Sequence, residues 1–317
     1  MRKALVIGID YYENVSKLRG CVNDAFNVKT VLERHSNGTK NFDVLLKYSL
    51  GSDSKIIRSE LKKDVKKLFS DKADIALFYF SGHGYIESTG GYLVTSECSD
   101  GDDGLPMNEL LTIANESKAT NKIIILDCCH AGVMGNNTPN EDKAFLSEGL
   151  TILTASSQDQ YALEIDGTGV FTSLFVDAMN GSASNLVGDV TPGSIYAHID
   201  QSLGPWEQRP IFKTNVRNFT TLRKVQPPIT LEDLKKITEY FTDKGMEFKL
   251  DPSFEPQSEN PNEDNVRAFS NLQKYNRVNL VVPVEATHMY FAAMQSKSCR
   301  LTVLGEHYWN LITKDRI

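Results

Sequence analysis

The stretch IIILDCCHAG, residues 123–132, decides how the rest of the chain is read. Its four consecutive aliphatic residues are typical of a parallel strand whose two faces are both covered by helices. The strand ends in an acid, two cysteines and a histidine. A second apolar run, ALFYFSGHGY at 76–85, ends in Ser81, Gly82 and His83. Functional groups in open parallel sheets gather at the carboxyl ends of strands, so we expect a thiol and an imidazole to meet there.

Around these runs, strand-length apolar segments alternate with amphipathic segments of helix length. This pattern predicts an α/β domain with a mostly parallel, six-stranded sheet flanked by helices. The clearest helix is expected over 55–69, where apolar residues recur every four positions and lysines occupy the other face. The expected strands are 4–10, 43–49, 75–80, 122–126, 151–155 and 210–213, and the other expected helices are 23–34, 108–115, 171–180 and 194–203.

Pro227 and Pro228 interrupt the alternation and mark a domain boundary. Residues 1–225 form the first domain, and residues 226–317 form a C-terminal module. In the module we expect a helix that follows Thr230, then a loop over 251–265, a further helix, and a strand over 278–284. Two more helices are expected near 288–295 and 308–313. Such a module is small and α/β or winged-helix-like.

The composition excludes several classes of function. A net charge of −7 over 317 residues argues against a nucleic-acid-binding protein, which needs a basic face. The apolar run near the N-terminus is too short for a signal peptide, and no run reaches membrane-spanning length, so we expect a cytoplasmic protein with no membrane contact. Five cysteines without disulfide or paired-ligand spacing indicate reduced thiols and no zinc site.

The alternation of side chains along an extended segment assigns the reactive thiol. Asp127 and Cys129 fall on one side and Cys128 on the other, so Cys129 is the better nucleophile and Cys128 a small apolar filler. A thiol needs a base within hydrogen-bond reach to become a strong nucleophile, and His83 would supply it. The backbone N–H groups of Gly84 and Cys129 would receive the developing oxyanion.

The spacing of His83 and Cys129 is close to the roughly 50 residues that separate histidine and cysteine in caspases. The chain resembles the caspase-like cysteine peptidases of clan CD (family C14), and more narrowly the metacaspases and their bacterial relatives. The resemblance rests on FSGHG, DCCHAG, LRGCVNDA following IGIDYY, and LTASSQDQYALEIDGTGVFTSLFVDAM, and it covers about residues 3–215. It implies a cysteine endopeptidase in which His83 is general base and then acid, while Cys129 forms an acyl-enzyme.

The residues around the expected nucleophile differ from those of animal caspases. Asp127 stands where the caspase motif has glutamine, and an anion at this position favours a cationic substrate side chain. The metacaspase resemblance implies a specificity pocket formed by Cys21, Asp24, Ser81 and Asp127, and hence cleavage after arginine or lysine. Asp24 has an alternative role as the cap of the helix that follows it.

The chemistry requires no cofactor and no metal. Several metacaspases are activated by calcium, and SDGDDG at 99–104 supplies three aspartates, but Met107 and Asn108 stand where a further aspartate pair is expected. Because a hard cation needs six or more oxygens, an exposed acidic turn is the favoured interpretation.

A long polar loop over 133–149 is a candidate activation loop, and Lys143, its one basic residue, is the candidate self-cleavage site. The C-terminal module carries no motif. By analogy with bacterial caspase-like effectors, it would act as a regulatory or sensor module for a nucleotide second messenger or a partner protein, in anti-phage defence or programmed cell death. Two alternatives remain, a catalytically silent scaffold and, less favoured, a thiol redox protein that uses the adjacent cysteines.

Overall fold

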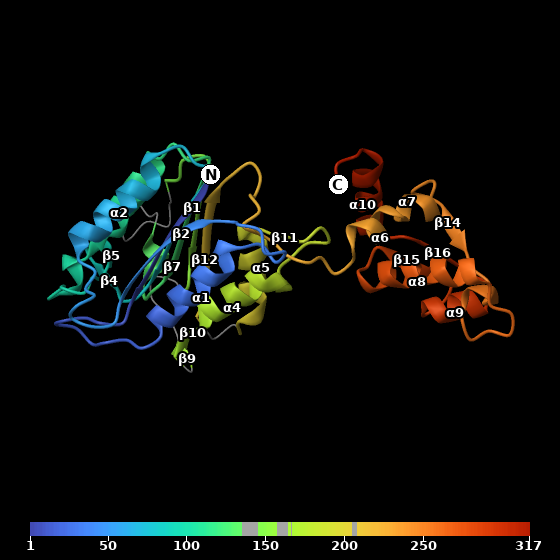
Figure 1. Ribbon diagram of the computed structural model, residues 1–317, viewed down its shortest axis with the longest axis horizontal. Helices are drawn as coiled ribbons and strands as arrows, with labels where there is room; N and C mark the ends of the chain where they lie inside the picture. Colours follow the sequence, from blue (N-terminus) through green and yellow to red (C-terminus); the bar gives the residue numbers. More distant parts are fainter. Residues whose placement is uncertain (135–144, 157–163, 166, 205–207) are drawn as a thin grey trace. The chain divides into compact units, whose positions relative to one another are not determined.

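The computed structural model describes residues 1–134, 145–156, 164–165, 167–204 and 208–317. Figure 1 shows the chain folded into two compact units. The first unit comprises residues 1–184 and 189–225, and the second comprises residues 185–188 and 226–317. Among the described residues, no helix combines the length and apolar character needed to span a membrane.

A six-stranded sheet forms the centre of the first unit, with the strand order β12-β8-β7-β3-β1-β2. Neighbouring strands are parallel except at one edge, where β12 pairs antiparallel with β8. This confirms the predicted mostly parallel sheet. The strands are β1 (Arg2–Ile9), β2 (Asp43–Ser49), β3 (Ile75–Ser81), β7 (Asn121–Asp127), β8 (Leu150–Thr154) and β12 (Ile211–Asn215).

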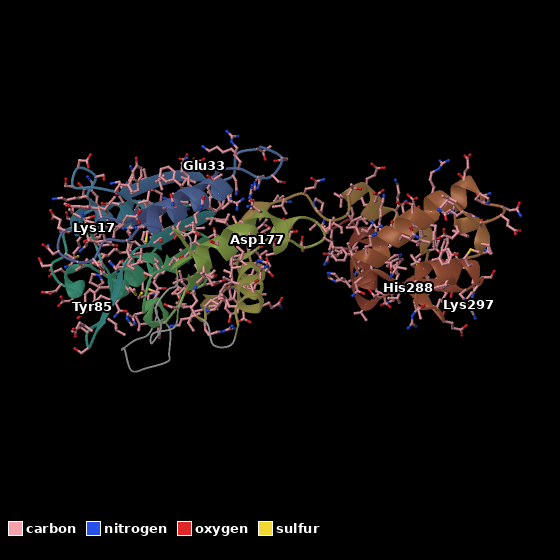
Figure 2. All side chains as sticks on the ribbon, turned by 90° about the horizontal axis from the view of Figure 1, so that it is seen from below. Lys17, Glu33, Tyr85, Asp177, His288 and Lys297 are labelled. Carbon is pink, nitrogen blue, oxygen red and sulfur yellow. The ribbon has the colours of Figure 1, made fainter. Side chains whose placement is uncertain are left out.

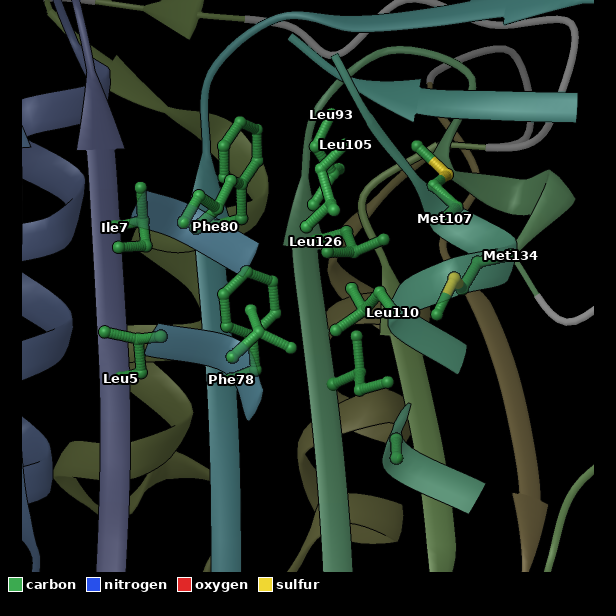
Figure 3. Packing of buried hydrophobic residues seen from close by; sticks show 14 of the residues in the cluster. Leu5, Ile7, Phe78, Phe80, Leu93, Leu105, Met107, Leu110, Leu126 and Met134 are labelled. Carbon is green, nitrogen blue, oxygen red and sulfur yellow. The ribbon is translucent and has the colours of Figure 1, made fainter. Parts of the chain in front are cut away.

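Helices cover both faces of this sheet, which explains why its inner strands are apolar along their whole length. On one face lie α1 (Cys21–Glu33), α4 (Val170–Asp177) and α5 (Pro192–Ser202), and on the other lie α2 (Arg58–Ser70) and α3 (Met107–Asn115) (Figure 1). Figure 3 shows the second of these layers, where Leu5, Phe78 and Leu126 project from β1, β3 and β7 toward Leu110 of α3.

Two predicted helices have different limits in the structure. The helix expected from residue 55 begins at Arg58, because Ile56 donates its N–H to the Ser96 hydroxyl at 3.2 Å and Ile57 is extended. The helix expected over 171–180 passes into a π-helical turn over Ala178–Ser182, within which Gly181 has a φ of 134° that suits glycine alone.

The short strands of the first unit were not predicted, because they contain too few residues to show a periodic pattern. Three of them, β4 (Gly84–Glu87), β5 (Gly90–Leu93) and β6 (Leu105–Pro106), form a small antiparallel sheet directly after His83. The others are the pairs β9 (Glu164–Ile165) with β10 (Thr168–Gly169), and β11 (Asp189–Val190) with β13 (Arg223–Lys224). Single 3₁₀ turns occur at Gly101–Asp103 and Ala131–Val133.

The second unit is built on a three-stranded antiparallel sheet with the order β14-β16-β15, and it has its own apolar core. Thr230 caps its first helix by accepting the Asp233 N–H at 3.1 Å. His288 and Lys297, labelled in Figure 2, lie just before and just after α9. Its elements are α6 (Leu231–Lys235), α7 (Ile237–Tyr240), β14 (Glu247–Lys249), a 3₁₀ turn (Pro252–Phe254), α8 (Glu263–Arg277), β15 (Val281–Val284), α9 (Met289–Met294), β16 (Ser298–Leu301) and α10 (Val303–Thr313).

Candidate active site

The carboxyl ends of β3 and β7 bring the histidine and cysteine segments together. Ser81 and Asp127 are register partners at the last position of the two strands, and the Gly82 N–H donates to the Asp127 carbonyl oxygen at 3.3 Å. Beyond these strands, the backbones of Gly84 and Cys129 pack so closely that a Cβ on Gly84 would collide with the Cys129 carbonyl oxygen. The residues after His83 and the residues around Cys129 therefore share one edge of the sheet.

The alternation rule does not extend to Cys129, because β7 ends at Asp127 and the chain turns over residues 128–130. His130 takes a left-handed conformation in this turn, with φ 58°. Cys128 is buried, and burial raises the pKa of its thiol well above the ordinary value, with Cys129 and Asp127 nearby adding to the rise. Cys129 is partly exposed. Of the two adjacent thiols, only Cys129 is accessible to a substrate.

The His83 side chain is oriented by groups from the segment that follows β1. Its Nε2 lies 2.7 Å from the Ser16 carbonyl oxygen and 3.3 Å from the Ser16 hydroxyl. A carbonyl oxygen can only accept, so Nε2 carries the hydrogen and Nδ1 of the neutral ring is left as the basic nitrogen. The His83 backbone N–H donates to the Tyr12 hydroxyl at 2.8 Å, and the two rings lie 4.7 Å apart.

The sequence analysis missed Ser16 and Tyr12. Ser16 acts through its main-chain carbonyl, which has the same chemistry in every residue, so no sequence signal marks it. Tyr12 lies in the quoted IGIDYY segment, but only the fold brings its hydroxyl to the histidine. An open pocket of about 270 Å³ reaches the imidazole, and its walls include Val15, Tyr85 (labelled in Figure 2) and Asp100.

The four residues expected to form the specificity pocket are brought together and are all buried. Their exposed fractions are 7% for Cys21, 2% for Asp24, 1% for Ser81 and 5% for Asp127. The Ser81 hydroxyl donates to Asp24 Oδ2 at 3.1 Å. Burial raises the pKa of the Cys21 thiol, and the carboxylates of Asp10, Asp127 and Asp24 raise it further. Cys21 therefore remains a neutral thiol in a buried acidic cluster, which consists of Cys21, Asp24, Ser81 and Asp127.

Asp24 is not the cap of helix α1. Asp10 has that role, because its Oδ1 accepts the N–H of Cys21 at 2.9 Å and of Val22 at 3.4 Å. The carboxylate of Asp24 instead accepts the Gly169 N–H, at 3.0 Å to Oδ1 and 3.2 Å to Oδ2. Asp24 is thus directed toward Asp127 and the start of α4.

Gly169 and Thr172, at the start of α4, complete the acidic cluster, and no sequence pattern indicated a role for either residue. The Thr172 hydroxyl donates to Asp127 Oδ2 at 2.6 Å. A Cβ at Gly169 would collide with Asp127 Oδ2 and would lie 3.0 Å from Asp24 Oδ2. Both carboxylates therefore converge on position 169, which has room only for glycine.

The acidic turn at 99–104 uses one of its carboxylates within the turn itself. Asp103 uses its Oδ2 to accept the N–H groups of Ser99 and Asp100, at 3.2 and 3.3 Å, and so caps its own 3₁₀ turn. Nowhere in the described ranges do three or more His, Cys, Asp or Glu side chains gather as a metal site requires. The candidate self-cleavage residue, Lys143, lies outside the described residues.

Comparison with known proteins agrees with this architecture. Solved structures with the same fold include the protein GSU0716 from Geobacter sulfurreducens (TM-score 0.53, 18% identity, covering 73% of this chain and 99% of that one). Another is caspase-1 from Spodoptera frugiperda (TM-score 0.51, 14% identity, covering 71% and 91%).

Sequence relatives include metacaspase-4 of Arabidopsis thaliana, 36% identical over 87 residues, and metacaspase-1A of Aspergillus oryzae, 34% identical over 86 residues. Each alignment covers 26% of this chain and 20% of the relative, so the matched stretch spans about a fifth of those proteins. The model of the caspase domain of peptidase family C14 matches residues 1–227, which is most of the chain. The chain therefore belongs to the caspase-domain family of cysteine peptidases.

Proposed function

We propose that this protein is a cysteine endopeptidase that cleaves protein substrates after arginine or lysine. One observation carries the proposal: the ends of β3 and β7 bring the His83 and Cys129 segments together beside a buried cluster that contains two carboxylates. Two carboxylates can bind a guanidinium or ammonium group through charge-assisted hydrogen bonds, and they repel an acidic side chain.

The reaction follows from the tautomer of His83. The basic Nδ1 takes the proton of the Cys129 thiol, and Sγ forms a bond to the scissile carbonyl carbon. The N–H groups of Gly84 and Cys129 stabilise the oxyanion of the tetrahedral intermediate. The C–N bond then breaks as the imidazolium returns its proton to the leaving amine. A water molecule, deprotonated by His83, hydrolyses the thioester and restores the thiol.

Fluorogenic peptides that end in arginine, lysine or aspartate test this proposal. We expect turnover of the first two, loss of turnover in Cys129→Ala, and retention in the matched control Cys128→Ala, which alters the buried neighbour. Asp127→Ala should sharply reduce turnover of the arginine and lysine peptides, whereas its melting temperature should change little. Cleavage after aspartate alone would disprove the specificity. Absence of turnover of all three peptides by the wild-type protein, with and without calcium, would favour a catalytically silent scaffold.

The second unit is proposed to regulate the peptidase. Its separate core and separate sheet support a module with its own role, and a nucleotide messenger or a partner protein is the proposed signal, in anti-phage defence or cell death. The five cysteines are all reduced, which favours the cytoplasm. If a chain that ends at Val225 keeps the activity and inducibility of the full chain, the second unit is not a switch.

Self-processing at Lys143 is a separate proposal. Intact-mass spectrometry of the wild-type protein beside Cys129→Ala tests it, since cleavage after Lys143 should appear in the wild-type protein alone. The same intact mass for both proteins would contradict it.

A further inference from the structure

A chain of three buried groups ends in the acidic cluster. The Tyr79 hydroxyl lies 2.5 Å from the Thr172 hydroxyl, and the Thr172 hydroxyl lies 2.6 Å from Asp127 Oδ2. The exposed fraction is 0% for Tyr79, 1% for Thr172 and 5% for Asp127. Tyr79 belongs to β3, Thr172 to α4 and Asp127 to β7, so three elements distant in sequence contribute one group each.

The direction of this chain is determined by the acceptor at its end. An ionised carboxylate can only accept, so the Thr172 hydroxyl donates to Asp127. Because a hydroxyl has one hydrogen, Thr172 must then accept from the Tyr79 hydroxyl. Burial raises the pKa of Tyr79 well above its ordinary value, with the charges of Asp24 and Asp127 adding to the rise, so its phenol keeps the proton that it donates.

Each carboxylate of the acidic cluster has donors of its own. Asp24 accepts from Ser81 and from the Gly169 N–H, whereas the Thr172 hydroxyl donates to Asp127. A change at Thr172 is therefore expected to act on Asp127, while the Ser81 hydroxyl and the Gly169 N–H still donate to Asp24. A substitution at Thr172 can therefore test the role of Asp127 separately from that of Asp24.

We propose that Thr172, supported by Tyr79, is a positioning residue for specificity, which holds the Asp127 carboxylate aimed at the basic side chain of the substrate. This inference rests on the proposed cleavage after arginine or lysine. The hydroxyl of Thr172 does not touch the scissile bond, so its loss should weaken ground-state and transition-state binding of the basic side chain alike and leave the chemical step unchanged.

The experiment compares three variants of the full chain. Thr172→Val keeps the shape of the side chain and removes the donor, and Thr172→Ser keeps the donor. Thr151→Val removes a buried hydroxyl that lies 2.8 Å from the Thr214 hydroxyl. The measured quantities are kcat and KM for arginine and lysine peptides, and the inhibition constant of agmatine, which carries a guanidinium without a scissile bond. Thermal melting confirms that each variant is folded.

We expect Thr172→Val to raise KM and the agmatine constant about tenfold at nearly unchanged kcat, because a hydrogen bond to a charged group is lost. Thr172→Ser should restore both constants, and Thr151→Val should leave them within twofold of wild type. Unchanged constants in Thr172→Val would overturn the inference, as would equal effects in Thr151→Val or no restoration by serine. A wild-type enzyme that cleaves neither basic peptide refutes the proposed function itself and the inference with it.

Discussion

His83 is held by a main-chain carbonyl, and this contact determines which of its nitrogens carries the hydrogen. The Ser16 carbonyl oxygen requires a hydrogen on Nε2, so in the proposed reaction the imidazole would enter as the tautomer whose Nδ1 can take a proton. Gly84 is the next residue along the chain, and its missing side chain lets the backbone of the histidine segment approach Cys129. The absence of a Cβ atom at Gly84 therefore allows the histidine and cysteine segments to approach each other.

Gly84→Ala should therefore separate the histidine and cysteine segments. The added Cβ would collide with the carbonyl oxygen of Cys129, and backbone on both sides must move to relieve the overlap. We expect a loss of about 1–3 kcal/mol in the free energy of unfolding and about a 100-fold fall in kcat/KM. Gly51→Ala is the control, because its new Cβ would meet only the flexible Asp53 carboxylate at 3.0 Å. Equal activity in the two variants would contradict the close approach.

At the scale of elements, the strand ends and helix starts supply the site. The ends of β3 and β7 supply Ser81 and Asp127, the first turn of α1 supplies Asp24, and the first turn of α4 supplies Thr172. At the opposite end of α1, His35 secures the strand β13, because its Nδ1 accepts the Lys224 N–H at 3.0 Å. Burial lowers the pKa of His35, and the cations Arg2, Lys224 and Arg223 lower it further.

The hydrogen bond from the Lys224 N–H to His35 should make the stability of the first unit depend on pH. In the unfolded chain His35 titrates near its ordinary value of 6.5, and in the folded chain it titrates lower. The unfolded state therefore binds more protons than the folded state between these two pKa values. The stability that neutral His35 contributes is fully present above pH 6.5 and is lost as the pH falls through the pKa of the folded state. We expect urea unfolding to show less stability at about pH 5.5 than at about pH 7.5. His35→Gln should show a smaller difference, and an unchanged difference would exclude His35 as its source.

At the scale of the whole molecule, the two units have separate cores. In the first unit, one apolar layer packs on each face of the sheet. The second unit has its own apolar core, which includes Phe269, whose side chain is 1% exposed. A substitution in one core should therefore act on that unit alone.

Phe269→Ala should destabilise the second unit by about 3–5 kcal/mol and leave the unfolding transition of the first unit in place. Phe78→Ala, in the core of the first unit, is expected to have the reverse effect. Calorimetry, with the peptidase assay alongside, checks both variants. A single transition lowered equally by either substitution would show that the two units unfold together.

Local pattern was sufficient to predict the long elements of the first unit. Each of its six central strands was expected within a few residues of its observed limits, because continuous apolar runs are a strong signal. The short strands β4, β5, β14 and β16 were missed, since three or four residues carry no period and form only because a neighbouring strand pairs with them.

By itself the sequence determined which side chains would reach the end of the sheet, because aliphatic runs end in Ser81, His83 and Asp127, with Cys129 close behind. Only the tertiary structure decided how those groups are held. Ser16 acts through a carbonyl, Gly169 through an N–H and the absence of a Cβ, and Thr172 through a hydroxyl delivered by a helix more than forty positions away from Asp127. Main-chain groups carry no residue identity, and long-range contacts leave no local period, so folding alone brings these partners into place.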